Sequence, residues 1–211
     1  AFLQENPVAL YALLTVAAET SEDIGNDMAI FYSSKPLRLA LFCCKVEVAS
    51  VSRINLFMRT ETIYTRSLSR TCFYVGRQFA ANHISPLVSV ILANQEPVAI
   101  NPERLEDAAD LDRNVANLRT LVETVISGIL VALNQLPIFI CVVALQLRKM
   151  ISRKFEKDES RAFSGFLILR FICPLLVTPE SYDVNFKDMS LEDRKKLVLV
   201  AKCVQAVVND A

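Results

Sequence analysis

Residues 190–208, SLEDRKKLVLVAKCVQAVV, show most clearly which secondary structure this chain forms. Apolar side chains recur there at three- and four-residue intervals, the spacing of one face of an α-helix. Because the basic residues fall outside this stripe, the pattern predicts an amphipathic helix with a buried apolar face and a basic exposed face. The apolar positions are Leu197, Val200, Ala201, Val204, Val207 and Val208, and the basic ones are Lys195, Lys196 and Lys202.

The start of this helix carries a capping signal. Ser190 is followed three residues later by Asp193, an arrangement like a capping box with Asp in place of the usual Glu or Gln. Similar start signals stand at Ser21, Pro36 and Asn101, where a capping residue or a proline precedes helical sequence. We therefore expect further helices after each of them, including helices over 37–48 and 111–133.

Composition favours the same fold class for the whole chain. Of its 211 residues 53% are apolar, whereas only 4 are Gly and 8 are Pro. This supplies material for one large core and few breaks in helical sequence. We predict an all-α fold forming a single domain over residues 1–211, and we expect this domain to be excised from a larger protein.

Charge and cysteine content restrict the classes of function. Lys plus Arg and Asp plus Glu number 23 each, and this balance argues against a nucleic-acid partner. The cysteines lack CxxC spacing and His83 is the only histidine, so we expect no metal site, and buried reduced thiols in a cytoplasmic protein. The six are Cys43, Cys44, Cys72, Cys141, Cys173 and Cys203.

One stretch supports a different class of protein. Residues 125–147, VISGILVALNQLPIFICVVALQL, contain no charge over 23 residues and are long enough to cross a bilayer. However, Asn134, Gln135 and Pro137 interrupt the stretch, as expected where one buried helix ends and another begins. We predict no transmembrane segment, with a membrane-embedded helical protein as the alternative.

Two segments carry a recognisable pattern. Residues 56–92, LFMRTETIYTRSLSRTCFYVGRQFAANHISPLVSVIL, contain Arg59, Gly76 and Ser85-Pro86-Leu87, and residues 166–179 read FLILRFICPLLVTP. Both resemble the catalytic domain of Ras GTPase-activating proteins, the second through the family motif FLRFINPAIVSP. INPERL at 100–105 and DRNVANL at 112–118 are similar to the corresponding stretch of neurofibromin, so the likeness covers about residues 20–211.

The chain departs from the family pattern near Arg59. Phe57-Met58 stands where Leu-Phe is usual, and Thr60-Glu61-Thr62 replaces a small residue followed by Asn and Ser. Cys173 takes the place of a frequent Asn in the second segment. These changes affect the expected loop geometry and choice of partner more than the resemblance itself.

The resemblance implies that Arg59 is an arginine finger, a side chain that enters the nucleotide site of a partner GTPase. Charge develops on phosphoryl oxygens as GTP is hydrolysed, and a guanidinium stays protonated and matches these oxygens with several donors. The main-chain carbonyl of Arg59 is implied to orient the water-positioning glutamine of the GTPase. Spacing alone favours an ordinary solvated arginine at this position, and only the ungapped run from Arg59 to Gly76 reverses that preference.

Four further residues receive roles from the resemblance. Arg170, a charge in an apolar run, is implied to hydrogen-bond the finger loop, although it could bind carbonyls for stability alone. Leu169 is implied to contact the GTPase switch region, or lies in the core. Lys202 is implied to face an acidic residue of the GTPase, or is solvated. Thr62 is implied to bind within the loop, or caps a helix.

The expected function is thus that of an activator acting on a partner enzyme. The sequence contains no Gly-rich phosphate loop, GxSxG elbow or HExxH motif, so we expect no hydrolase chemistry of its own. The expected partner is a GTP-bound Ras-family GTPase that itself holds GTP and magnesium, and no cofactor is expected here. An IQGAP-like GTPase-binding module without activation is the alternative. We expect a cytoplasmic monomer, recruited to the inner membrane face by flanking domains.

Overall fold

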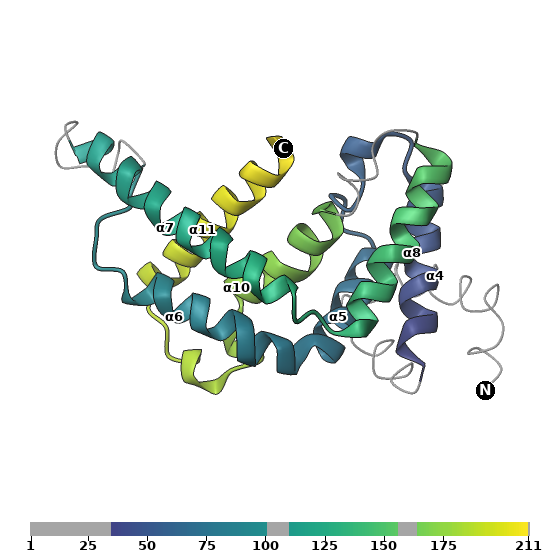
Figure 1. Cartoon of the computed structure of the whole chain (residues 1–211), viewed down its shortest axis with the longest axis horizontal. Helices are drawn as coiled ribbons and strands as arrows, with labels where there is room; N and C mark the ends of the chain where they lie inside the picture. The colour runs from purple at the N-terminus through teal and green to yellow at the C-terminus, as the bar shows by residue number, and fades with distance from the viewer. Residues whose placement is uncertain (1–34, 101–109, 156–163, 211) are drawn as a thin grey trace. The chain divides into compact units, whose positions relative to one another are not determined.

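The computed structural model describes residues 35–100, 110–155 and 164–210 (Figure 1). Within these ranges the chain forms α-, 3-10 and π-helices joined by turns, and no strand. The predicted all-α fold is confirmed. The helix starts predicted at Ser21 and Asn101 lie outside the described residues.

The chain divides into two compact units, each built from two separate stretches of sequence. The first contains Ala1–Gly76 and Pro137–Phe171, and the second contains Arg77–Leu136 and Ile172–Ala211. Helix α5 (Ile63–Phe79) and the π-helix η4 (Gly165–Ile172) each cross from one unit to the other. The prediction that residues 1–211 form one domain stays a prediction.

In the first unit, α4 (Pro36–Ser50) and α8 (Ile138–Lys154) pack side by side (Figure 1). Lys154 Nζ donates hydrogen bonds to the carbonyls of Val48 and Ala49, at 2.6 and 2.9 Å. These are carbonyls at the end of α4, which its own helix leaves without partners. A cation of α8 therefore closes the end of the neighbouring helix.

Gly76 allows an aromatic ring to pack directly on α5. A Cβ added at Gly76 would lie 2.6 Å from Cζ of Phe171, closer than real Cβ contacts. The ring of Phe171, which is 1% exposed, fills the space that any other residue at position 76 would occupy. This contact fixes the residue that follows Arg170 against the helix that follows Arg59.

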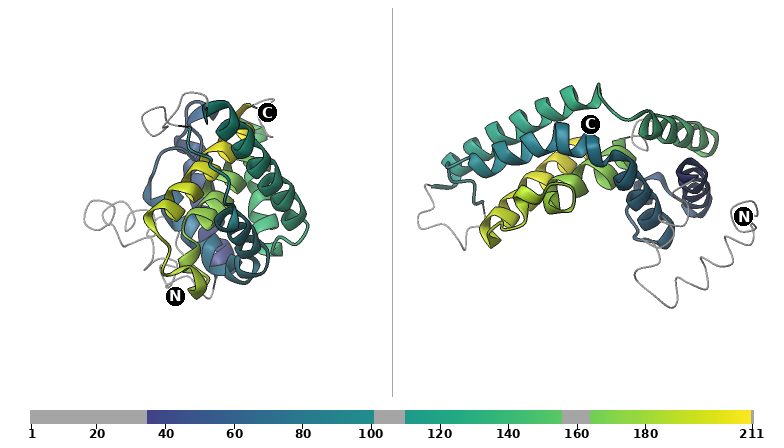
Figure 2. Two further views of the ribbon diagram at one scale, coloured as in Figure 1. Left: turned by 90° about the vertical axis from the view of Figure 1, so that its left-hand side faces the viewer. Right: turned by 90° about the horizontal axis from the view of Figure 1, so that it is seen from below.

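The second unit is built around three mutually packed helices, α6 (Ser85–Ala93), α7 (Asp110–Leu133) and α11 (Leu191–Asp210) (Figure 2). The π-helix η2 (Ala80–Ile84) leads into α6, and α10 (Cys173–Val177) packs on α11. The 3-10 helices η5 (Pro179–Ser181) and η6 (Val184–Phe186) connect α10 to α11. Ser85 Oγ donates to Asp183 Oδ2 at 2.6 Å and ties this connection to α6.

The capping box at the start of α11 is confirmed. Ser190 Oγ accepts a hydrogen bond from the Asp193 N–H at 3.1 Å, and Asp193 Oδ2 accepts one from the Ser190 N–H at 3.2 Å. The predicted apolar stripe is buried from Leu197 to Val204. It is wrong at Val207, which is 50% exposed because the last part of α11 projects past α7 (Figure 1).

The uncharged stretch 125–147 is not one helix. Helix α7 ends at Leu133 and α8 begins at Ile138, with Pro137 at its N-terminus, as the interruption predicted. Among the described residues, α7 itself is long and apolar enough to cross a membrane by length and composition, and 33% of its apolar window is buried. Core helices of globular proteins also reach this length.

The cysteines are less uniformly buried than predicted. Cys43, Cys44, Cys72 and Cys173 are buried, and burial raises the pKa of the Cys44 thiol to about 12. The prediction is wrong for the remaining two, since Cys141 is exposed and Cys203 is half-buried. Both lie on helices of which one side faces outward, so an apolar neighbourhood in sequence did not ensure burial.

Candidate functional site: the turn that presents Arg59

A tight turn carries Arg59 between the 3-10 helix η1 (Ile54–Leu56) and α5. The Arg59 N–H donates to the Leu56 carbonyl at 3.1 Å, which closes a four-residue turn. Phe57 has φ −58° and ψ 129°, and Met58 has φ 58°. These angles match a type II β-turn, whose third residue needs a positive φ and is usually Gly or Asn.

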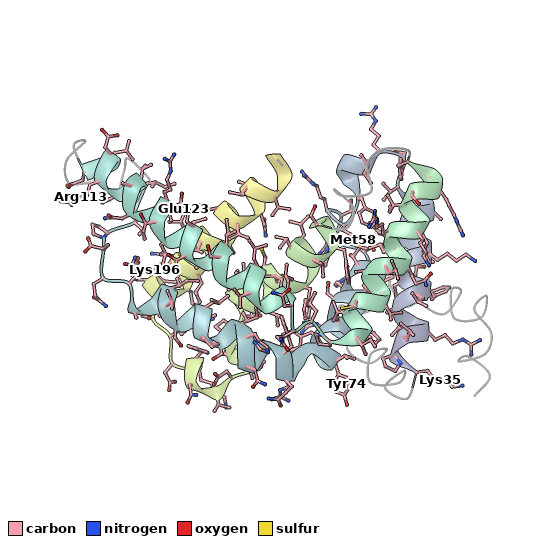
Figure 3. The ribbon with its side chains drawn as sticks, in the orientation of Figure 1. Lys35, Met58, Tyr74, Arg113, Glu123 and Lys196 are labelled. Atoms are coloured by element: carbon pink, nitrogen blue, oxygen red, sulfur yellow. The ribbon has the colours of Figure 1, made fainter. Side chains whose placement is uncertain are left out.

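The turn separates its side chains into buried and exposed ones. Phe57 and Met58, the latter labelled in Figure 3, are 3% and 1% exposed. Arg59, in contrast, is exposed. Two consecutive apolar side chains thus anchor the turn in the first unit. The side chain that follows them is directed outward.

Two charged side chains hold the backbone of this turn. Glu47, which is 2% exposed on α4, accepts a hydrogen bond from the Met58 N–H through Oε1 at 3.1 Å. Arg170 of η4 donates from Nε to the Met58 carbonyl at 2.7 Å and from Nη2 to the Thr60 carbonyl at 3.0 Å. One guanidinium therefore binds the carbonyl of the residue before Arg59 and the carbonyl of the residue after it.

The charges of Glu47 and Arg170 support one another. Burial raises the pKa of Glu47, while the Met58 N–H and then Arg170 lower it. Burial lowers the pKa of Arg170, while Glu61 and then Glu47 raise it. Each group thus offsets part of the cost of burying the other, because opposite charges favour their ionised forms.

Thr62 lies at the start of α5 and caps it. Its Oγ1 accepts from the Thr65 N–H at 3.1 Å, and Thr65 Oγ1 accepts from the Thr62 N–H at 2.9 Å. Thr65 Oγ1 also donates to the Thr60 carbonyl, at 3.2 Å. The hydroxyl of Thr62 is thus used within its own helix start, and a contact of Thr62 with a partner stays a prediction.

The other candidate residues lie in different places. Leu169 is half-buried in η4, next to Arg170, in the first unit. Lys202 is exposed on α11 in the second unit, where it lines a groove of about 740 Å³ between residues 95–100 and α11. The first unit therefore brings Arg59, Thr62 and Arg170 to one loop. The roles of all five residues toward a GTPase stay predictions.

Glu47 and Met58 are the residues that sequence reasoning missed. The available signal was a carboxylate between Val46 and Val48 in an apolar stretch. A single charge in a helix is more often solvated, so this signal did not single out Glu47. Among the described residues, no group of three or more His, Cys, Asp or Glu side chains could hold a metal ion.

Comparison with known proteins identifies the family. Residues 105–209 match the model of the family described as GTPase-activator protein for Ras-like GTPase. The chain belongs to the RasGAP family. Arg59 lies before the matched residues, whereas α11 and the segment around Arg170 lie within them.

Curated relatives extend the RasGAP likeness to nearly the whole chain. A probable Ras GTPase-activating-like protein of Dictyostelium discoideum is 25% identical over 98% of this chain and 24% of its own length. Ras GTPase-activating protein 3 of Bos taurus is 26% identical over 81% of the chain and 21% of its own length. A GTPase-activating protein of Drosophila melanogaster is 24% identical over 77% and 14%, so the chain spans about a quarter or less of these relatives.

Proposed function

We propose that this RasGAP-family chain stimulates GTP hydrolysis by a Ras-family GTPase, with Arg59 as an arginine finger. One observation carries the proposal: an exposed arginine stands on a turn whose backbone is held by two side chains of opposite charge. Side chains that only need to be solvated do not require such support. The family membership and the names of the relatives agree with this activity.

The chemistry needs both the guanidinium and its rigid support. In the transition state, charge spreads over the transferring phosphoryl group, and a cation supplied in trans is worth about 10³ to 10⁵ in rate. Such a gain requires the cation at a defined position, because misplacement by about 1 Å can cost about 10²-fold. A backbone fixed before the partner arrives avoids ordering the loop during the reaction.

The partner would supply the remaining parts of the site. We expect a GTP-bound GTPase that holds GTP and magnesium, and we propose that this chain acts as an activator without a cofactor of its own. A module that binds a GTPase without activating it, as in IQGAP-type proteins, is not favoured by the names of the relatives. The test below separates these two functions.

The experiment is single-turnover GTP hydrolysis by GTP-loaded Ras and Rap with saturating wild type, Arg59→Ala, Arg59→Lys and Arg53→Ala. Arg53 is the matched control, because it is an exposed arginine of the same loop. We expect Arg59→Ala to lose about 10³-fold or more of the stimulation, and Arg59→Lys to recover little because it lacks the planar fork. Arg53→Ala should resemble wild type.

Two outcomes would contradict the proposal. Equal stimulation by wild type and Arg59→Ala would remove the role of the finger. Binding of wild type to GTP-loaded GTPase without any acceleration would make the chain a binding module.

A further inference from the structure

The peptide bond between Phe57 and Met58 can face in two directions. Type I and type II turns differ chiefly in ψ of the second residue and φ of the third, so that the central peptide is rotated by roughly half a turn between them. This chain adopts the type II form with Met58 at φ 58°. Residues other than Gly and Asn seldom adopt this conformation, so something outside the turn must favour it.

Glu47 is positioned to decide between the two forms. Its Oε1 lies 3.1 Å from the Met58 nitrogen and accepts the N–H of the central peptide. In the opposite orientation, the carbonyl oxygen of Phe57 would turn toward a buried carboxylate oxygen. Two acceptors would then face each other without a proton between them, and both would lack a partner in a buried place.

Arg170 does not provide this selection by itself. It binds the carbonyl of Met58, which belongs to the peptide group after the central one, and the carbonyl of Thr60, which lies beyond the turn. The central N–H donates to Glu47, which lies on a different helix. Arg170 could not take over this contact, because a guanidinium donates hydrogen bonds but does not accept them. The two side chains thus hold consecutive peptide groups of one turn.

We infer that Glu47 is a positioning residue for Arg59, which acts by holding the 57–58 peptide in the type II orientation. This inference rests on the proposed function, since it assigns Glu47 to the support of the same arginine finger. With the peptide reversed, the Phe57 carbonyl would face Glu47, and the turn would have to move away from α4 to separate the two acceptors, which would displace Arg59. Glu47 itself is buried and reaches neither the partner nor GTP.

The kinetic test compares Glu47→Met, Glu47→Gln and Thr71→Val with wild type on GTP-loaded Ras. Met fills a similar volume without a strong acceptor, whereas Gln retains an oxygen that can accept the Met58 N–H. Thr71 is the matched control, because it is a buried polar residue of α5 whose hydroxyl donates to the carbonyl of Ser67, at 2.7 Å, within its own helix. Its loss removes a buried hydrogen bond that does not touch the turn.

We expect Glu47→Met to lower the maximal stimulated rate about tenfold or more, with the half-maximal concentration changed less than about twofold. Glu47→Gln should stay within about threefold of the wild-type rate, and Thr71→Val should leave it unchanged. A wild-type rate for Glu47→Met would overturn the inference. An equal loss in Glu47→Gln and Glu47→Met would also overturn it, because the acceptor oxygen would then be irrelevant.

A second measurement needs no GTPase. Amide hydrogen exchange should show a protected Met58 N–H in wild type and in Glu47→Gln, and at least tenfold faster exchange in Glu47→Met. Fast exchange of this amide in wild type would overturn the inference even if Glu47→Met failed to fold. If wild type stimulates no GTPase but its Met58 amide is protected as described, the proposed function fails while the hydrogen bond from Met58 to Glu47 stands.

Discussion

The turn around Arg59 and the basic face of α11 both offer cations to solvent, but they are built differently. At the turn, three backbone groups near Arg59 are held by Glu47 and Arg170, at 2.7 to 3.1 Å. On α11, the basic side chains are paired with their own surroundings: Arg194 with Glu180 at 2.7 Å and Lys195 with Glu192 at 2.6 Å. Lys196 of this face donates to the Asn94 carbonyl at 2.8 Å (Figure 3).

Together with the proposed function, this difference predicts two uses of positive charge. A guanidinium that must meet phosphoryl oxygens needs a defined position, which only a fixed backbone provides. Cations that attract an acidic partner act over several ångströms and tolerate freedom of the side chain. Substitutions at the support of the turn should therefore lower the rate of hydrolysis, whereas those on α11 should weaken association.

The largest effect after Arg59 itself is expected at Arg170. We predict that Arg170→Ala lowers the maximal stimulated rate about 10²-fold, because the Met58 carbonyl loses its hydrogen bond from Arg170, the Thr60 carbonyl keeps only that from Thr65, and the turn shifts. The free energy of unfolding should also fall by about 1 to 3 kcal/mol, since the carbonyl of the buried Met58 loses its hydrogen bond from Arg170. Single-turnover hydrolysis and urea denaturation measure the two effects.

Arg194→Ala is the control for Arg170, since it breaks an ion pair of the α11 face instead. It should leave the maximal rate within about twofold of wild type, because a half-exposed ion pair contributes little. If folded Arg170→Ala stimulates hydrolysis at the wild-type rate, the rate does not depend on the support of the turn. The turn and α11 would then not differ in their effect on the rate.

A moderate effect on stability is expected at Gly76. The added Cβ in Gly76→Ala would lie 2.6 Å from Cζ of Phe171, so the ring or the helix must move. We predict a loss of about 1 to 3 kcal/mol in the free energy of unfolding, measured by chemical denaturation. The displacement should also reach Arg170, the residue next to Phe171, and lower the stimulated rate.

Gly165→Ala is the matched control for this change. A Cβ at Gly165 meets nothing within 4 Å, so the substitution should leave the free energy of unfolding unchanged or raise it by up to about 1 kcal/mol. Similar unfolding free energies for the two variants would show that the contact between Gly76 and Phe171 is not tight.

The smallest effect is expected on α11. We predict that Lys202→Ala raises the half-maximal concentration for stimulation about three- to tenfold at low salt and leaves the maximal rate unchanged. The difference should shrink as salt is raised, because screening weakens charge attraction. Titration of the chain against GTP-loaded Ras at two salt concentrations measures this.

Lys187→Ala is the comparison for Lys202, as Lys187 is an exposed lysine outside the groove. It should leave the half-maximal concentration unchanged. A lower maximal rate in Lys202→Ala, at saturating concentration, would mean that α11 takes part in hydrolysis. It would contradict the expectation that α11 affects association alone.

Much of the fold could be predicted because its signals are local. The ends of the helices around Pro137 and the capping box at Ser190 depend on residues a few positions apart. The need of Arg170 for acceptors was also predictable, since a guanidinium in an apolar run must find them. Val207 and Cys141 were predicted buried and are exposed, because apolar periodicity does not reveal where the covering helices end.

The sequence by itself determined the helical class, the cap of α11 and the division of the uncharged stretch, since each depends on backbone preferences and hydrogen bonds between near neighbours. Only the tertiary structure decided the turn that presents Arg59. Met58 has no intrinsic preference for φ 58°, and the side chains that bind its N–H and its carbonyl lie 11 and 112 positions away along the chain. Their distance from the turn is set by the packing of α4 and η4, which no local pattern encodes.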